Sequence, residues 1–310
     1  MNGQMALRIG LIGGFQGGKS TLINCLLENR VAVTGIGLST TKYLVEYYYS
    51  PRVRFSEVCG AREKDLFMDQ FLHSAPPKTD VVYRIGLPSP LLQSVSLIDT
   101  PGFDAEERDD RIAEKGFADL DFAIFVLGGT RGALNKPECA TLYKLSEYRI
   151  PVLIVFNSHG DTDVQWDPSS QINCLLRKNV SAQIKQMGLM RCIPLCGEDV
   201  FAINTAWCWY AISEQRGHDF LLPEAKREKA LKRSVRIFFA GEEDISEKQL
   251  MERSRIGILR EFLTEGGTMF GNVHTTTAIY NAFDDMCMQI VRSMEMICSR
   301  SAKPLERFKY

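Results

Sequence analysis

The glycines, the lysine and the serine of residues 13–20 have the types and the spacing of a loop that holds phosphate groups. The segment reads GGFQGGKS and fits the pattern G-x-x-x-x-G-K-[ST]. Glycines let successive backbone N–H groups approach phosphate oxygens, and the N-terminus of a following helix adds its positive dipole end. We therefore predict a nucleotide site in which Lys19 contacts the β and γ phosphates and Ser20 ligates Mg²⁺. The candidate binding residues of this loop are Gly13, Gly14, Phe15, Gln16, Gly17, Gly18, Lys19, Ser20 and Thr21.

A second motif stands at the end of an apolar run farther along the chain. Residues 94–100 read SVSLIDT, and the run delivers Asp99 and Gly102 in the pattern D-x-x-G. A nucleoside triphosphatase uses such an aspartate to hold Mg²⁺ through water and such a glycine N–H to reach the γ phosphate. The alternative is an ordinary Asp-Pro-Gly turn at a strand end. The phosphate loop upstream favours the nucleotide interpretation.

Hydrolysis of a triphosphate also needs a group that orients the attacking water. Gln16 in the phosphate loop and Thr41 in the polar segment 30–42 are the candidates, although the loop position of Gln16 often contributes only its backbone. With Lys19 and Gly102 they form the candidate catalytic set.

The elements that must position these residues are indicated by hydrophobic periodicity. Strands are predicted at 6–13, 43–50, 53–60, 81–87, 94–100, 122–129 and 151–161, and one last strand with its loop is predicted at 192–207. Helices are predicted at 19–28, 64–73, 136–148, 169–188, 253–263 and 275–299. This alternation predicts an α/β fold, a P-loop NTPase domain whose mostly parallel sheet has helices on both faces, with ligands at the carboxyl ends of the strands.

Two local signals refine this arrangement. Ser50-Pro51-Arg52 predicts a hairpin that joins strands 43–50 and 53–60. Gly266-Gly267 predicts the end of the preceding helix, so we expect a G domain over 1–266, with a helical insert at 208–250, and a C-terminal helical extension over 267–310. The helix at 275–299 has one apolar stripe, which we expect to pack on the rest of the chain; the alternative is that it pairs with a second chain.

Composition narrows the class of protein. The chain has 310 residues, is 45% hydrophobic and carries a formal net charge of −1, which gives no reason to expect nucleic-acid binding. No apolar run approaches the roughly 20 residues that span a bilayer, and no signal peptide is recognisable, so the cytoplasm is the expected location. Nine cysteines without a CxxC pair fit a reducing compartment.

One charged region keeps two interpretations. Residues 223–236 (PEAKREKALKRSVR) are basic and residues 241–249 are acidic. Such runs usually form solvated helix and loop surface, and the alternative for the basic run is a phosphate-binding patch.

The residues quoted so far carry a resemblance. The stretch GGFQGGKSTLINCLLENRVAVTGIGLSTTKYLVEYY, the motif DTPGFD and the helix RSRIGILREFL resemble parts of the G domain of bacterial dynamin-like GTPases. The resemblance implies GTP and GDP as ligands and Mg²⁺ as cofactor, with Ser20, Asp99 and Thr41 (or its neighbour Thr40) around the metal. It implies a G-domain dimer or a partner dynamin-like protein. The stalk of these proteins is expected to be much shortened or absent here, with peripheral membrane contact only through a partner.

The chain departs from this family at the guanine-reading motif [NT]-K-x-D. Here the sequence reads Asn157-Ser158-His159-Gly160, and Asp161 comes one position late. The lysine that stacks on the base is missing, and Asn157 and Asp161 are the candidates for base contacts. Three hypotheses follow: a Mg²⁺-dependent GTPase whose switch loops report nucleotide state, a slow or non-hydrolysing nucleotide-gated interaction module, and an ATPase with relaxed base specificity.

Overall fold

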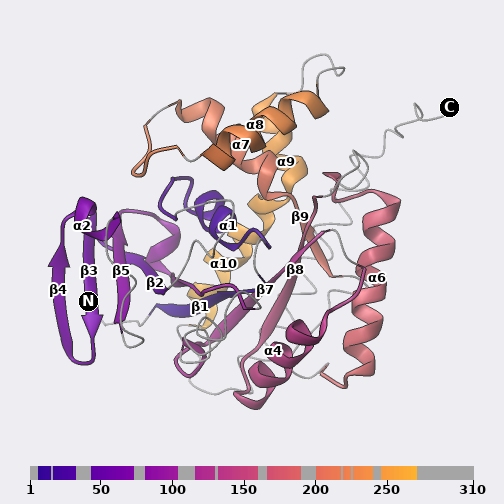
Figure 1. Cartoon of the computed structure of the whole chain (residues 1–310), viewed down its shortest axis with the longest axis horizontal. Helices are drawn as coiled ribbons and strands as arrows, with labels where there is room; N and C mark the ends of the chain where they lie inside the picture. Colours follow the sequence, from indigo (N-terminus) through magenta and orange to yellow (C-terminus); the bar gives the residue numbers. More distant parts are fainter. Residues whose placement is uncertain are drawn as a thin grey trace.

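One nine-stranded sheet organises the chain in the computed structural model (Figure 1). The structure describes residues 6–14, 17–32, 43–72, 81–103, 116–129, 132–159, 166–189, 200–217, 219–224, 226–239 and 246–270. The strands are β1 (Leu7–Ile12), β2 (Leu44–Tyr49), β3 (Arg54–Cys59), β4 (Arg62–Leu66), β5 (Val81–Leu87), β6 (Val95–Asp99), β7 (Phe122–Gly128), β8 (Val152–Asn157) and β9 (Phe201–Ile203).

Their order across the sheet is β4-β3-β5-β2-β6-β1-β7-β8-β9. The five strands from β6 to β9 run parallel to one another, whereas β2 is antiparallel to β6 and β3 is antiparallel to both β4 and β5. The predicted α/β fold with a mostly parallel sheet is confirmed.

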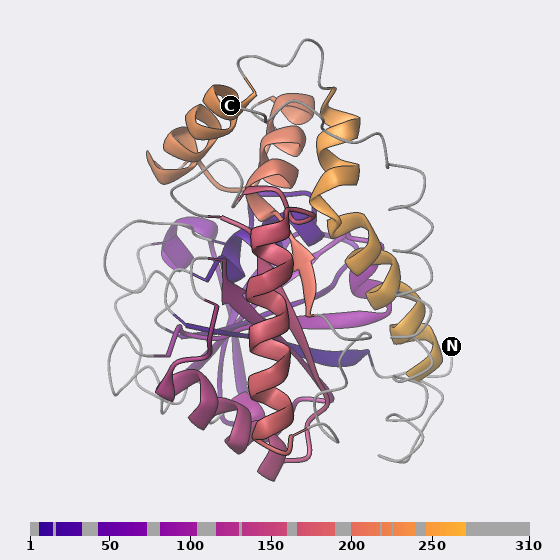
Figure 2. The same ribbon diagram turned by 90° about the vertical axis from the view of Figure 1, so that its right-hand side faces the viewer.

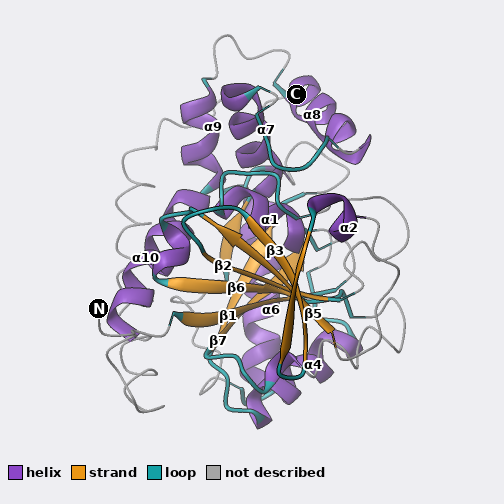
Figure 3. Ribbon diagram, turned by 90° about the vertical axis from the view of Figure 1, so that its left-hand side faces the viewer, coloured by secondary structure: helices purple, strands orange, loops and turns teal. Residues whose placement is uncertain are grey.

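Helices cover both faces of the sheet, as Figures 2 and 3 show from opposite sides. They are α1 (Lys19–Leu26), α2 (Met68–Leu72), α4 (Lys136–Glu147), α6 (Gln171–Gln186), α7 (Thr205–Arg216), α8 (Lys226–Phe238), α9 (Glu247–Ser254) and α10 (Ile256–Phe270), with a 3₁₀ turn η1 at Leu91–Gln93. Among the described residues, no helix is both long and apolar enough to cross a lipid bilayer.

Alternation along each strand divides the core in two. In β7, Ile124 and Val126 pack with α1 and α10, whereas Ala123 and Phe125 pack with α4 and α6 on the opposite face. The central strands are buried on both faces, which explains why they read as continuous apolar runs. Because β1, β6, β7 and β8 run parallel to one another, their carboxyl ends lie at the same edge of the sheet.

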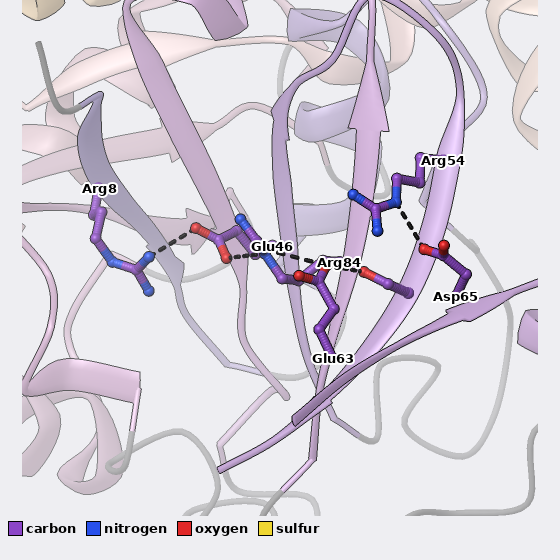
Figure 4. A network of polar contacts seen from close by, with 7 residues as sticks. Arg8, Glu46, Arg54, Glu63, Asp65 and Arg84 are labelled. Carbon is purple, nitrogen blue, oxygen red and sulfur yellow. Dashed lines mark hydrogen bonds and ion pairs between the residues drawn. The ribbon is translucent and has the colours of Figure 1, made fainter. Parts of the chain in front are cut away.

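Ion pairs tie the antiparallel half of the sheet to its centre (Figure 4). Arg8 on β1 donates from Nη1 to Glu46 Oε1 on β2 at 2.7 Å, reaching across the intervening β6. Arg84 on β5 donates from Nε to the other oxygen of Glu46 at 2.9 Å and contacts Glu63 on β4 at 3.4 Å. Glu46 is buried, so both of its oxygens need these partners.

The structure corrects the predicted hairpin at Ser50-Pro51-Arg52. β2 pairs with β5 and β6, and β3 pairs with β4 and β5, so β5 lies between the two strands that we expected to be neighbours. The hairpin is instead β3–β4, where Cys59 pairs with Arg62 across a tight turn at Gly60, whose φ is +58°. The helix predicted at 64–73 is correspondingly shorter, because its first residues belong to β4.

In the C-terminal half, the segment 192–207, predicted as one last strand and its loop, contains the strand β9, and residues 192–199 lie outside the described residues. Its end is helical instead of a loop, because Asn204 caps α7 by accepting a hydrogen bond from the Trp207 N–H at 2.9 Å. The helix at 253–263 does not end at Gly266-Gly267, because α10 continues to Phe270. The predicted helix 275–299 lies outside the described residues.

The end of α1 is held by a distant helix. Arg260 of α10 donates from Nε to the Leu26 carbonyl at 3.1 Å and from Nη2 to the Cys25 carbonyl at 3.1 Å. It also forms an ion pair with Glu28, just beyond α1. These contacts satisfy carbonyls that a helix C-terminus leaves without partners.

Candidate functional site

The phosphate loop leaves β1 and enters α1 through glycines that side chains could not replace. Gly18 is the N-cap of α1 in the left-handed region, with φ +96°. A Cβ at Gly18 would collide with Asn157 Nδ2, and a Cβ at Gly13 would collide with the Val126 carbonyl oxygen. Gly17 donates its N–H to the Gly14 carbonyl at 3.3 Å. The described glycines of the loop therefore lie tightly against the ends of β7 and β8.

Lys19 folds back over this loop. Its ammonium Nζ donates to the Gly13 carbonyl at 2.8 Å and to the Gly14 carbonyl at 3.1 Å. Burial lowers the pKa of Lys19 from 10.5 to about 8, although the nearby charge of Asp99 raises it. The loop thus holds a cation close to its own backbone, where a phosphate group would be received.

The lowered pKa of Lys19 makes a pH-dependent prediction. Without ligand the ammonium loses its proton near pH 8, whereas a triphosphate stabilises the charged form and raises that pKa. Binding above this pH must then take up a proton, so we expect affinity to fall up to about tenfold for each pH unit between roughly pH 8 and 10. Titrations of a non-hydrolysable triphosphate analogue at a series of pH values measure this slope.

The arginine variant is the matched control for this titration. Arginine stays protonated over the whole range. The Lys19→Arg chain should therefore bind more weakly than wild type but lose the slope. Equal affinity of the wild-type chain at about pH 7 and pH 9.5 would contradict the assignment of Lys19 as the titrating group.

Ser20 and Asp99 meet beside the loop. The Ser20 hydroxyl donates to Asp99 Oδ2 at 3.1 Å, and Asp99 is buried at the carboxyl end of β6. Thr100 holds this end of β6 against β1 by donating from Oγ1 to the Leu11 carbonyl at 2.8 Å. A hydroxyl and a buried carboxylate form the hard oxygen set that suits Mg²⁺. Gly102 lies beside the loop too, because its neighbour Phe103 forms a parallel bridge with Gly14.

Asn157 at the end of β8 supports the loop from the other side. Its amide donates from Nδ2 to the Gly17 carbonyl at 3.1 Å and accepts at Oδ1 from the Thr205 N–H at 3.1 Å. Both ends of the side chain are therefore engaged within the protein. Asn157 links the phosphate loop to the first residue of α7.

The two residues after Asn157 are held by the ends of neighbouring strands. Ser158 takes the position of the lysine in the motif [NT]-K-x-D, and it is buried, with its N–H donated to the Ile203 carbonyl at 2.7 Å. His159 Nδ1 lies 2.9 Å from the Asn157 carbonyl oxygen and 3.1 Å from the Gly129 nitrogen. Neither residue supplies a long cationic side chain for stacking on a base.

The structure brings most of the predicted site residues to one edge of the sheet. They are Gly13, Gly14, Gly17, Gly18, Lys19, Ser20, Thr21, Asp99, Gly102 and Asn157. Phe15, Gln16, Thr40, Thr41 and Asp161 lie outside the described residues. Sequence reasoning missed Thr205 and Val126. Thr205 could have been found, because Asn204 before an apolar helix is an N-cap signal, whereas Val126 acts through its backbone and leaves no signal in the sequence.

Comparison with known proteins finds a family that part of this chain resembles. Residues 9–143 match the model of the dynamin family. Over 148 residues, 47% of this chain, the sequence is 28% identical to a probable transmembrane GTPase FZO-like, chloroplastic, of Arabidopsis thaliana. Over 112 residues, 33% of the chain, it is 32% identical to dynamin-like protein 2 of Campylobacter jejuni. These matches span only 14% and 18% of the two relatives.

A solved structure shares the architecture. The chain superimposes on an oligomerised bacterial dynamin pair, described as sensing and tethering membranes over long range, with a TM-score of 0.56 and 11% sequence identity. The match covers 96% of this chain and 50% of that chain. At this identity the likeness concerns the fold.

Proposed function

Because this chain belongs to the dynamin-like superfamily of P-loop GTPases, we propose that it binds GTP and hydrolyses it to GDP and phosphate. The observation that carries the proposal is the phosphate loop, where Lys19, Ser20 and Asp99 converge within hydrogen-bond distance of one another or of the loop backbone. Phosphoryl transfer needs positioning and charge neutralisation more than covalent chemistry, and these residues supply both.

Each residue has a role in this proposal. Lys19 exchanges the carbonyls of Gly13 and Gly14 for phosphate oxygens and offsets their charge. Ser20 and Asp99 would hold Mg²⁺, which would neutralise charge on the β and γ phosphates. The backbone of Gly102 and the side chains of Gln16 and Thr41 remain the proposed contacts to the γ phosphate and the attacking water.

Base recognition is proposed to differ from the usual motif. Asn157 is already engaged with Gly17 and Thr205, which supports a role in shaping the loop. Ser158 offers no cation at the lysine position. Asp161 is then the proposed acceptor for the N1 and N2 hydrogens of guanine.

Competition between GTP and ATP tests whether Asp161 recognises the guanine base. A carboxylate that accepts from guanine is worth about 1.5–3 kcal/mol, so we expect GTP to displace a labelled analogue at roughly ten- to a hundredfold lower concentration than ATP. The Asp161→Ala chain should lose this preference. Asp219→Ala removes an exposed carboxylate elsewhere and is the control. A strong GTP preference that survives in Asp161→Ala would exclude Asp161 as the reader.

Phosphate release tests the activity itself. We expect steady release with Mg²⁺ and GTP, none from Lys19→Ala, and less with ATP. Tight GTP binding without release, at low and high protein concentration, would favour the nucleotide-gated interaction module. Release that rises with protein concentration would support a second G domain as partner, in line with the oligomerised pair that shares the fold.

The remaining parts of the proposal concern the setting of the domain. The proposed division is a G domain over residues 1–266 and a helical extension over 267–310, a boundary that falls inside α10, which continues to Phe270. GTP, GDP and Mg²⁺ are the proposed ligands, and a second G domain or a dynamin-like chain is the proposed partner. The cytoplasm is the proposed location, supported by free cysteines in the described part of the chain, including buried Cys25 and Cys208.

A further inference from the structure

A pocket of about 420 Å³ lies between α7 and α8, near the end of α7 that is remote from Asn157. Figure 1 shows the two helices side by side beyond the sheet. The pocket is lined by Ser213, Glu214, Gly217, Glu224, Lys229, Lys232, Arg233 and Arg236. Its volume is in the range of small-molecule sites.

The lining carries an excess of positive charge. Four of these residues are cations and two are carboxylates, so the formal charge of the lining is +2. The cations stand at spacings of three and four along α8, which places them on one side of the helix. The apolar side of α8, with Leu231 and Val235, packs on α7, and the cations flank this contact at the mouth of the pocket. The Lys232 side chain is largely covered, at 17% exposed, whereas Lys229, Arg233 and Arg236 reach into solvent.

Ion pairs use only part of this charge. The ammonium of Lys232 lies 3.0 Å from one carboxylate oxygen of Glu224, and the ammonium of Lys229 lies 3.8 Å from the other. Arg236 Nη2 donates hydrogen bonds to the two carboxylate oxygens of Glu214, at 3.0 and 3.2 Å. Arg233 forms no ion pair with the described residues. Within the described part of the chain, the Arg233 guanidinium therefore has no anionic partner.

The pKa of Glu224 also reflects the excess of positive charge around the pocket. Partial burial alone would raise the pKa of this carboxyl, but the hydrogen bond from Lys232 and the charges of Lys232, Lys229 and Arg30 outweigh it and leave the pKa below its ordinary value. The surroundings of the carboxyl thus favour negative charge.

The hydroxyl of Ser213, in the wall of the pocket, is a second indication of a ligand. The residue is only 2% exposed, and its hydroxyl has no hydrogen-bond partner among the described residues. Buried hydroxyl groups are normally satisfied, so an unpaired one in a pocket wall needs an explanation. A bound acceptor oxygen would provide it.

We propose that the α7–α8 pocket binds a small phosphate-bearing anion, with Arg233 and Lys229 meeting its charge and Ser213 donating to one of its oxygens. This site is separate from the phosphate loop and does not depend on the proposed GTPase activity. The ligand chemistry is a phosphate monoester, supplied either by a free metabolite or by the headgroup of a lipid.

Calorimetric titration of the full-length chain with glycerol 3-phosphate tests the proposal. We expect Arg233→Ala and Ser213→Ala each to weaken binding, about tenfold or more for Arg233→Ala, because a charge-assisted contact is lost. Lys178→Ala removes an exposed cation on α6 and should leave binding unchanged. Lys19→Ala should leave it unchanged too, which separates this pocket from the phosphate loop.

The variants distinguish a site from a general charge effect and from a folding defect. Ser213→Ala removes an unpaired hydroxyl, so its thermal stability should equal or exceed that of wild type while binding weakens. Titrations that are insensitive to both Arg233→Ala and Ser213→Ala, or equally sensitive to Lys178→Ala, would overturn the proposal.

Vesicles distinguish the two sources of the phosphate. Co-sedimentation with vesicles of phosphatidylcholine and phosphatidic acid, lost in Arg233→Ala and displaced by glycerol 3-phosphate, would identify a lipid headgroup as the ligand. Binding of glycerol 3-phosphate without co-sedimentation would identify a soluble phosphate ester. Vesicle binding that persists in both pocket variants would come from another surface and, with unaltered glycerol 3-phosphate titrations, would contradict the pocket.

Discussion

The Lys19→Ala chain will fold but will not bind a nucleoside triphosphate at concentrations that saturate the wild type. The ammonium is the buried cation that the loop holds against the carbonyls of Gly13 and Gly14, 2.8 and 3.1 Å from Nζ. A charge-assisted hydrogen bond to a phosphate is worth about 1.5–3 kcal/mol, and Lys19 would make such contacts to two phosphates. We expect affinity to fall at least ten- to a hundredfold, measured with a labelled GTP analogue.

Ser20→Ala is the matched variant for this experiment. It removes the hydroxyl that donates to Asp99 but leaves the ammonium in place. It should retain triphosphate binding and lose part of the dependence on Mg²⁺. Thermal unfolding of both variants checks that they fold. Binding by Lys19→Ala as tight as that of wild type would refute the site.

Gly18→Ala should destabilise the chain and disable the loop together. Gly18 has a φ of +96°, which costs an L-residue about 1–2 kcal/mol. In addition its Cβ would displace the Asn157 amide, which is buried and bonded to both Gly17 and Thr205. Losing these contacts adds about 1–3 kcal/mol. Denaturant unfolding should show a total loss of roughly 2–5 kcal/mol.

Gly188→Ala separates backbone strain from the collision. Gly188 has a φ of +74°, and no atom lies within 4 Å of an added Cβ. This variant should lose only about 1–2 kcal/mol and keep full nucleotide affinity. Equal losses of stability in the two variants would mean that the contact with Asn157 contributes nothing.

Local patterns predicted the core of the fold well. β1, β6, β7 and β8 are buried on both faces, so their sequences are continuous apolar runs that no solvated element resembles. The motifs at their carboxyl ends converge because parallel strands share an edge. Gly13, Gly17, Ser20, Asp99 and Asn157 could therefore be assigned to one site before their contacts were known.

The wrong predictions lie where contacts between segments distant in the sequence decide the local structure. Ser50-Pro51-Arg52 forms a turn, but whether the next strand returns beside β2 depends on competition with β5, which matches β2 over its whole length. Gly266-Gly267 carries a helix penalty of about 1 kcal/mol per glycine, and packing of α10 on the sheet through Leu259, Phe262 and Leu263 outweighs it.

The contacts of Arg260 affect the order in which parts of the chain can fold during synthesis. Arg260 follows Leu26, whose carbonyl it binds, by 234 residues. At a synthesis rate of about 5–20 residues per second, α1 emerges roughly 10–50 s before the side chain that ends it. Until then water must satisfy the carbonyls at the last turn of the helix that begins with Lys19, so this long-range contact forms only once nearly the whole G domain has left the ribosome.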